Sequence, residues 1–344
     1  MPPELQDLAS RFRRFASQQA RPSGPLYEQL ALGISEDAEV LGLAAQATRS
    51  PVTNLLFAAV HCLLLEGRSH PLSRFYADLT PEPEPAEAAY PLFQSFCREY
   101  RKPLAEILTT RCTQTNEVRR CSWLAPGLSV VASRTPRFSM IDVGSSAGLH
   151  LVWRRFGYNY NGHRLGDPDS PVQLRCDLRG PEIPDFPETW PEPVEQTGID
   201  LHPLNPCDAS DRMWLRALVW PEHRDRAALL ERALSLAAVS PPPVLAGDAF
   251  DLLPELITRT PAGTAVCVCH NLVLNQFSDP ERVRFDRMLS ELSSGREIYR
   301  LSGEWIATKD PELTLTLYRD GNKSQRLLAV VDDHGAWIRW ARKL

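Results

Sequence analysis

The pattern of apolar and polar positions changes near residue 138. Before that point, apolar residues recur at helical spacing, as in Leu5 to Gln19, and the stretch from Val52 to Leu65 is apolar nearly all round. Helical spacing predicts amphipathic helices, and a stretch that is apolar on every side predicts a buried helix. No run typical of a strand precedes Phe138. Residues 1–133 are therefore expected to form an all-helical cap domain.

From residue 138 onward, short apolar runs alternate five times with helical segments. Alternation of strands and helices is typical of a parallel sheet with helices on both faces. The chain then closes with two alternating runs, Leu313 to Arg319 and Arg326 to Asp332, which flank Asp320-Gly321 and predict a β-hairpin. The predicted fold class is α/β, and residues 134–344 are expected to form the second domain.

Residues 157–193 interrupt this alternation. Pro, Gly and Asp accumulate there, and only Val172 to Leu178 has the pattern of a strand. Long irregular segments inside a compact domain are usually functional or mobile. The pattern predicts an inserted hairpin or lid.

Composition narrows the classes of protein. A chain of 344 residues with 43% apolar content can form two domains with sizeable cores. The net charge of −5 argues against a broad nucleic-acid surface, and no apolar run reaches the roughly 20 residues of a membrane span. Met1-Pro-Pro-Glu-Leu5 lacks the pattern of a signal peptide. A cytoplasmic protein with a small-molecule substrate and no membrane partner is expected. The oligomeric state stays open.

The eight cysteines contain no C-x-x-C pair, which favours reduced core thiols. Cys267 and Cys269 would share one face of a strand, with His270 beside them. A fourth ligand at zinc-like spacing is missing, so no metal site is predicted.

The central motif is the stretch from Phe138 to Leu151. An apolar run ends on Asp142, and the apolar pattern then resumes as a helix. Three interpretations are open: a nucleotide-binding turn, a G-x-S-x-G elbow with Ser146 as nucleophile, and a turn that only packs. The turn contains Gly144, Ser145, Ser146, Ala147 and Gly148.

The elbow interpretation requires several earlier strands and an oxyanion loop of the His-Gly-Gly type upstream. Neither is predicted before Phe138, so this interpretation loses most of its support. A serine hydrolase that uses Ser146 with His270 or His334 as base is kept as an alternative. A non-catalytic nucleotide-binding protein is the other alternative.

Polar residues end each predicted parallel strand. One such residue alone is typical of a helix cap or a turn, but parallel strands present their carboxyl ends at one edge, so together they predict one crevice. His270 could act there as a base, since its charge changes near neutral pH. Asn116, Glu117 and Arg120 precede the first strand and are candidate substrate or cofactor contacts. The residues at the strand ends are Asp142, Asp200, Asp248, His270, Asn271 and Glu304, and the last three are the candidate catalytic residues.

The segment Asp142-Val-Gly-Ser-Ser-Ala-Gly148 resembles the first motif of class I S-adenosylmethionine-dependent methyltransferases, with Ser146 in place of the usual middle glycine. The resemblance implies a Rossmann-like methyltransferase sheet whose sixth and seventh strands are the closing hairpin. It also implies S-adenosylmethionine as cofactor and S-adenosylhomocysteine as product. A methyltransferase acting on a small molecule beneath the helical cap and the lid is expected.

The same resemblance assigns cofactor contacts. Gly144 and Gly148 would approach the methionine part, with Ser145 and Ser146 in the same turn. Asp200 would bind the ribose hydroxyls, and Asp248 with Ala249 would face the adenine. Asn-Pro-Pro-Tyr is absent after the fourth strand, so methylation of an adenine or glutamine amino group is not implied.

The whole chain is also similar to a bacterial family known as DUF2332, for which the resemblance implies no activity. The similarity lies in seven segments. They are Gly24-Pro-Leu-Tyr, Ala58-Ala-Val-His-Cys-Leu-Leu-Leu, Gln114-Thr-Asn-Glu-Val-Arg-Arg-Cys, the Asp142 turn with Leu149, Gly198-Ile-Asp-Leu-His-Pro-Leu, Val219-Trp-Pro-Glu-His and Gly247-Asp-Ala.

Overall fold

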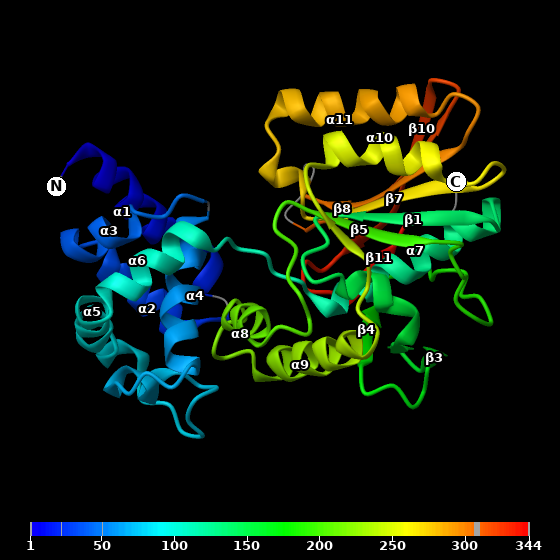
Figure 1. Ribbon diagram of the computed structural model, residues 1–344. Coiled ribbons are helices and arrows are strands. Elements are labelled where there is room, and N and C mark those ends of the chain that lie inside the picture. Colours follow the sequence, from blue (N-terminus) through cyan, green and yellow to red (C-terminus); the bar gives the residue numbers. More distant parts are fainter. Residues whose placement is uncertain (1, 22, 50, 306–309, 343–344) are drawn as a thin grey trace. The chain divides into compact units, whose positions relative to one another are not determined.

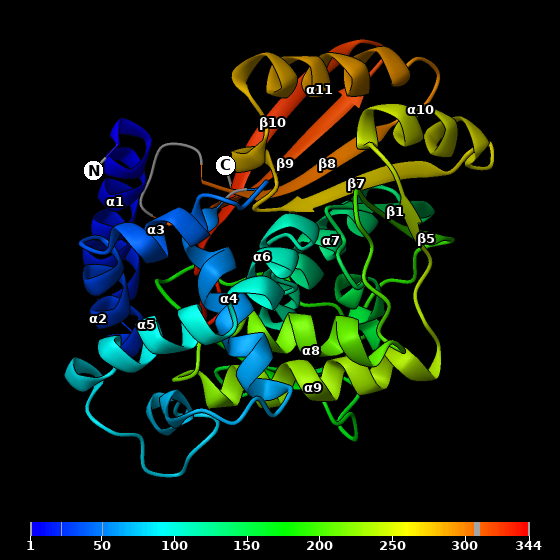
Figure 2. The ribbon, with the colours of Figure 1, turned by 60° about the vertical axis from the view of Figure 1, so that its left-hand side comes forward.

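A computed structural model describes residues 2–21, 23–49, 51–305 and 310–342. It contains helices and one mixed sheet of 11 strands, so the α/β class is confirmed. The chain divides into two compact units (Figures 1 and 2). The first contains residues 1–115 and 208–231, and the second contains residues 116–207 and 232–344. No helix among the described residues is long and apolar enough to cross a membrane.

The first unit is built from helices, and its described residues form no strand. The apolar stretch predicted as a buried helix is α4, Val52–Leu65, and eleven of its residues are buried. The other longer helices of this unit are α1 (Pro3–Phe15), α2 (Pro25–Ile34), α3 (Ala38–Ala44), α5 (Tyr90–Glu99), α6 (Arg101–Thr110) and α8 (Ala209–Ala217). Helix α9, Arg224–Val239, begins in the first unit and ends in the second.

Buried polar contacts hold residues 208–231 within the first unit. His61, which is fully buried on α4, donates from Nδ1 to the carbonyl oxygen of Ala217 at 3.0 Å. Its Nε2 lies 3.0 Å from Oδ2 of Asp78, which also accepts a hydrogen bond from Arg216 at 2.6 Å. Glu222 accepts a hydrogen bond from the amide of Leu26 at the start of α2. Two distant chain segments therefore share one core.

The second unit contains the whole sheet. Five strands form a parallel block in the order β6-β5-β1-β7-β8, and β9 and β10 continue it as an antiparallel meander. The bounds of these strands are β1 (Phe138–Val143), β5 (Gln196–Asp200), β6 (Val244–Ala246), β7 (Ala265–Asn271), β8 (Ile298–Glu304), β9 (Glu312–Arg319) and β10 (Asn322–Val331). Numbered along the chain, the parallel block has the order 3-2-1-4-5 of doubly wound sheets, whose topological switch point lies between β1 and β7.

Helices cover both faces of the parallel block, as Figures 1 and 2 show. Helices α10 (Ala249–Arg259) and α11 (Asp279–Leu292) pack on the face that carries Val266 and Val268. Helix α7 (Cys121–Arg134) packs on the opposite face, where Trp123 lies directly over Gly303. Each strand residue therefore belongs to one of two environments, which alternate along the strand.

Residues 157–178 are part of the sheet instead of a separate lid. Strands β2 (Gly157–Tyr160) and β3 (His163–Gly166) form the expected hairpin. Strand β4 (Gln173–Leu178) pairs in parallel with β2 and with β11 (Trp337–Trp340), which joins them to β10. Tyr158 and Tyr160 are buried, and this apolar face explains why the segment is packed.

The division of the chain also differs from the boundary expected at residue 133. Helix α7 belongs to the second unit, because it packs on the sheet through Trp123 and through Gly127, which lies against Leu301. The short helix expected after β1 is a 3-10 helix, η5 (Leu149–Arg155). Helical periodicity alone predicted these helices but could not assign α7 to a unit.

Candidate functional site

The turn after β1 depends on three residues in the left-handed region. Gly144, Ser146 and Gly148 have φ values of +73°, +53° and +72°. The amides of Gly144 and Ser145 both donate to the carbonyl oxygen of Ile199 on β5, at 2.8 and 3.1 Å. Ser145 donates from Oγ to Oδ2 of Asp142 at 2.8 Å. Glycine accepts this backbone conformation without strain, whereas Ser146 adopts it at a cost.

Both glycines of the turn are also tightly packed. A Cβ at Gly144 would lie 2.5 Å from Cγ2 of Val273, and one at Gly148 would lie 2.6 Å from Cγ of Pro242. In this conformation, side chains of the protein occupy the positions beside the two glycines. The turn therefore packs against the rest of the protein, which was one of the three interpretations left open by the sequence. A ligand that approached Gly144 would meet Val273.

Asp200 joins the turn to the end of β5. Its Oδ2 accepts a hydrogen bond from the amide of Ser146 at 2.8 Å, and its Oδ1 accepts one from the amide of His202 at 2.8 Å. The side chain of Asp200 is only partly buried, so its carboxylate is open to a ligand at the carboxyl end of β5.

Asp248 and Ala249 begin α10 at the end of β6. Oδ1 of Asp248 accepts a hydrogen bond from the amide of Phe250 at 2.8 Å, which makes Asp248 the N-cap of the helix. The side chain is exposed, whereas Ala249 is buried in the core between sheet and helix. Asp248 therefore has the capping geometry that is ordinary for an acidic residue at this position.

The three candidate catalytic residues do not form one group, because β7 directs its last two side chains to opposite faces. His270 lies on the α10 and α11 face, where its ring contacts Phe285 edge-on at 5.8 Å. Asn271 lies on the α7 face, where its Nδ2 is 3.3 Å from Nδ1 of His150. Neighbouring residues of a strand point to opposite sides of the sheet. The side chains of His270 and Asn271 are therefore separated because the two residues are adjacent in the strand.

His270 and Glu304 form a buried pair. Nδ1 of His270 lies 2.7 Å from Oε1 of Glu304, and both side chains are almost completely buried. Glu304 also accepts hydrogen bonds from the amides of Val273 and Leu274, at 2.8 and 3.2 Å. With two amides donating to it, the carboxylate acts as an acceptor, so Nδ1 of His270 carries the hydrogen. In the neutral tautomer Nε2 is then the acceptor nitrogen, and within the described residues it has no partner.

His150 is a buried member of the site that the sequence interpretation missed. Its Nε2 lies 3.1 Å from the carbonyl oxygen of Glu117, so this nitrogen carries the hydrogen. Its Nδ1 faces Asn271 and lies 3.7 Å from Oδ2 of Asp142. His150 follows the glycine turn by two residues, but its partner Asn271 is 121 positions away, and no local pattern predicts that contact.

Asn116 and Glu117 reach the same region from the segment before α7. Oδ1 of Asn116 accepts a hydrogen bond from the amide of Leu149 at 3.1 Å, which satisfies a donor at the start of η5. Both residues are buried, so they are not part of a solvated helix face. They lie beside the turn and His150, at the carboxyl end of β1.

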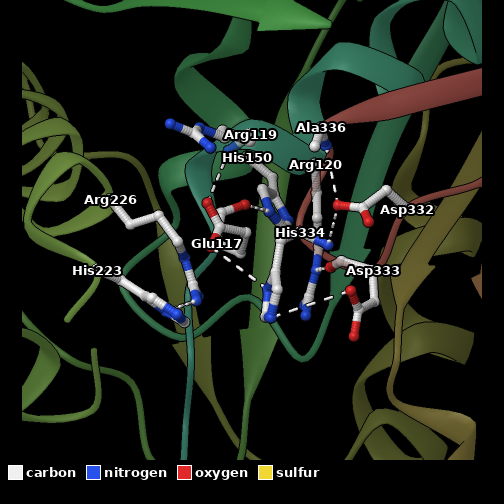
Figure 3. A network of polar contacts seen from close by, with 10 residues as sticks. All are labelled: Glu117, Arg119, Arg120, His150, His223, Arg226, Asp332, Asp333, His334 and Ala336. Carbon is white, nitrogen blue, oxygen red and sulfur yellow. Dashed lines mark hydrogen bonds and ion pairs between the residues drawn. The ribbon is translucent and has the colours of Figure 1, made fainter. Parts of the chain in front are cut away.

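Arg120 and the carboxylate of Glu117 belong to a neighbouring polar network (Figure 3). Nε of Arg120 donates to the carbonyl oxygen of Asp333 at 2.9 Å. Nδ1 of His334 lies 3.6 Å from Oε2 of Glu117, and the side chain of His334 is partly exposed. This network connects the loop between β10 and β11 to the residues beside His150.

The hydrolase alternative has one feature in its favour, because the left-handed Ser146 has the strained backbone of a nucleophile elbow. The two proposed bases are directed elsewhere. His270 is paired with Glu304 on the α10 and α11 face, and His334 lies beside Glu117 and Asp333. His270 is therefore paired with a carboxylate and not with the serine that a Ser-His pair requires.

The cysteines next to His270 do not form a metal site in the described part of the chain, where no cluster of three or more His, Cys, Asp or Glu side chains suits a metal ion. Sγ of Cys267 and Sγ of Cys269 lie 3.7 Å apart on the α7 face, opposite His270. Burial raises the pKa of the Cys269 thiol well above its usual value. These cysteines are core residues.

Comparison with known proteins identifies one family. The family model described as an uncharacterized protein conserved in bacteria, DUF2332, matches residues 9–340. No curated protein matches the chain.

Proposed function

Because the chain belongs to the DUF2332 family of uncharacterized bacterial proteins, whose description names no activity, we propose a function from the geometry of the second unit. We propose that this unit binds S-adenosylmethionine at the carboxyl edge of its parallel strands. We further propose that the protein transfers the methyl group to a small-molecule acceptor, with S-adenosylhomocysteine as the product.

One observation carries the proposal: the carboxylate of Asp200 on β5 holds the turn that follows β1 by accepting from the Ser146 amide. Strand β5 is next to β1, and β1 borders the topological switch point of a 3-2-1-4-5 sheet. Ligands of open α/β sheets bind at this crevice. Asp142, Asp200 and Asp248 lie at or just beyond the carboxyl ends of the three adjacent strands β1, β5 and β6, in an order suited to one extended ligand.

The donor and acceptor groups at this edge fit a nucleoside cofactor. Asp200 presents a partly exposed carboxylate for the two ribose hydroxyls, and Asp248 and Ala249 lie one strand further out, toward the adenine end. On the methionine side the turn offers Gly144, Ser145, Ser146 and Gly148. Because Val273 fills the space beside Gly144, binding requires the segment after β7 to shift.

The residues around this edge supply positioning and proton acceptance. S-adenosylmethionine contributes an electrophilic methyl group, so the protein has only to align an acceptor and, for an N–H or O–H acceptor, to take its proton. Nε2 of His270 is the available nitrogen base, and Glu304 orients the ring through Nδ1. Asn271, His150 and Asn116 lie on the α7 face of the sheet, where Asn271 contacts His150 and Asn116 holds the start of η5, and so they position the turn after β1.

A non-catalytic role on the same scaffold is the second candidate. The observation that favours it is the packing of Val273 and Pro242 against the two glycines of the turn. A protein that had lost its chemistry could keep this turn purely as a packing element.

Isothermal titration with S-adenosylmethionine and S-adenosylhomocysteine tests the proposal. The wild type is expected to bind both, and Asp200→Asn to weaken both by about tenfold or more, because hydrogen bonds to a charged group contribute about 1.5–3 kcal/mol. Asp177→Asn, an exposed position on β4, is the matched control. If neither ligand produces heat and neither shifts the melting temperature, cofactor binding is refuted.

Binding alone does not distinguish the catalytic role from the non-catalytic one, so turnover must be measured as well. Formation of S-adenosylhomocysteine with any member of a panel of amines, phenols, thiols and carboxylates supports the methyltransferase. Binding without turnover across the whole panel supports the non-catalytic role.

A further inference from the structure

The face of the sheet covered by α10 and α11 carries a buried histidine whose second ring nitrogen has no partner among the residues that the structure describes. Nε2 of His270 is completely buried, and within the described residues it has no hydrogen-bond partner. Because Nδ1 donates to Glu304, Nε2 presents a lone pair and requires a donor. Buried polar atoms without a partner are rare in folded proteins and call for an explanation.

Three phenylalanines form a cluster that reaches this histidine through one of its members, Phe285. Phe250 from α10, Phe285 from α11 and Phe277 from the connection between β7 and α11 lie 5.6–6.0 Å apart, centroid to centroid. The ring of Phe285 contacts His270 edge-on. Phe285 is buried, but Phe250 and Phe277 are only half-buried, so the cluster reaches the surface. Flat apolar walls with one inward acceptor are complementary to an aromatic ring that carries an N–H or O–H group.

The segment that carries Phe277 is tied to the same carboxylate as His270. It begins at Leu272, which is in the left-handed region with a φ of +57°, a conformation that is strained for a leucine. Glu304 accepts hydrogen bonds from the amides of Val273 and Leu274 and also holds His270. One carboxylate thus sets both the histidine and the path of the segment that leads to Phe277.

We propose that His270, Phe250, Phe277 and Phe285 form a binding site for a planar aromatic ring bearing an N–H or O–H donor, with Nε2 of His270 as the acceptor. The ring enters as Phe277 shifts outward, and it then packs against the Phe277 ring. Two sources offer this chemistry: a separate aromatic methyl acceptor, in which case the inference rests on the proposed function, and the adenine of a nucleoside cofactor, which would then lie at β7 instead of at the end of β6.

Ligand-observed NMR and isothermal titration with adenosine, purine riboside, phenol and indole test the site. Purine riboside lacks the amino group of adenosine and carries no N–H or O–H donor on its base. The wild type is expected to bind adenosine about tenfold more tightly than purine riboside. His270→Leu removes the acceptor and is expected to abolish that preference. His163→Leu, at an exposed histidine of β3, is the matched control and is expected to behave as the wild type.

Competition separates the two sources. Displacement of adenosine by S-adenosylhomocysteine assigns the site to the cofactor ring. Binding of phenol or indole in the presence of saturating S-adenosylhomocysteine assigns it to a separate aromatic acceptor. Phe277→Leu, at a half-buried position, serves if His270→Leu does not fold, and it is expected to weaken every aromatic probe about fivefold through lost ring contact.

The inference is overturned if the wild type binds none of the four probes. It is also overturned if folded His270→Leu keeps the wild-type affinities and preference, or if Phe277→Leu leaves every probe unaffected. The proposed function fails separately: phenol binding without any S-adenosylhomocysteine binding would refute the cofactor and keep the aromatic site.

Discussion

Oε1 of Glu304 lies 2.7 Å from Nδ1 of His270, 34 positions earlier in the chain. The two residues end neighbouring parallel strands, β7 and β8, on the same face of the sheet. The carboxylate is satisfied by one imidazole and two amides, so it fixes both the histidine tautomer and the path of the chain after β7. The pair of His270 and Glu304 is thus both part of the buried core of the second unit and the group to which we assign proton acceptance.

Glu304→Gln is expected to destabilise the protein by about 1–3 kcal/mol, because the amide group of Gln would face a donor and leave it buried without a partner. Glu255→Gln is the matched control, since Glu255 and Arg259 form an exposed pair one helical turn apart. Denaturant unfolding measures both variants. Equal midpoints for the two variants would contradict the role assigned to Glu304.

Gly144→Ala and Gly263→Ala separate backbone strain from packing. The two glycines have nearly the same φ, +73° and +71°, but a Cβ at Gly263 would meet nothing within 4 Å, whereas one at Gly144 would contact Val273. Gly263→Ala is expected to cost about 1 kcal/mol of unfolding free energy from strain alone. Gly144→Ala should cost about 1–3 kcal/mol more, because overpacking adds to the strain. Equal losses would show that Val273 moves aside freely.

Most of the elements could be predicted from the sequence, since periodicity reports local burial. The helix Val52–Leu65, the strand ending at Asp142 and the closing hairpin all follow from apolar spacing. The grouping of His270, Asn271 and Glu304 could not be predicted in the same way. Position at a strand end is visible in the pattern, but the face depends on register, which placed Asn271 beside His150 and His270 beside Glu304.

The sequence also could not predict that the strands of residues 157–178 join the far end of the sheet. Strand β4 pairs with β11, more than 150 residues later, and short strands such as β2 and β11 have only four residues each. Such short runs carry too little periodicity to indicate partners. The pairing of β4 with β11 is seen only in the folded chain, in which the aromatic side chains of β2 are buried.

Asp78 in the first unit should stabilise the fold at neutral pH and lose this effect in acid. Burial alone would raise its pKa, but hydrogen bonds from His61 and Arg216 outweigh burial and hold the pKa of Asp78 below its usual value. A lowered carboxylate pKa contributes stability above the unfolded value of about 4, and the contribution fades as pH falls through the folded value.

Asp78→Asn is therefore expected to lower the unfolding free energy by about 3 kcal/mol at about pH 7, with the difference from wild type shrinking below about pH 4. Urea unfolding at several pH values measures it. Asp7→Asn, on an exposed ion pair with Arg11, is the control and should change little. A difference between Asp78→Asn and wild type that is constant with pH would contradict this assignment.

Glu222 should show the opposite dependence. Burial is the largest cause of the raised pKa of Glu222, and repulsion from Asp78 adds to it. A raised carboxylate pKa favours the folded state most below the unfolded value of about 4, and this favourable contribution is lost as pH rises through the folded value. Gln keeps an oxygen for the amide of Leu26 and carries no charge to bury.

Glu222→Gln is therefore expected to stabilise the protein relative to wild type at about pH 8, by about 1 kcal/mol, with the gain disappearing near about pH 4. Thermal or urea unfolding across this range measures the gain. A loss of stability at the alkaline end would show instead that the ionised carboxylate is required at the start of α2.

Thiol reactivity should report on the fold of both units. Cys207 is exposed, whereas Cys62 and Cys176 are buried, and burial raises the pKa of each of these two thiols to about 12. Because the thiolate is the reactive form, titration with an aromatic disulfide reagent near neutral pH is expected to show a fast phase from Cys207. Cys207→Ser should remove that phase, while Cys62 and Cys176 should react only as the chain unfolds. Rapid modification of Cys62 or Cys176 in the folded protein would show that the helical core or the β4 face opens far more often than its burial implies.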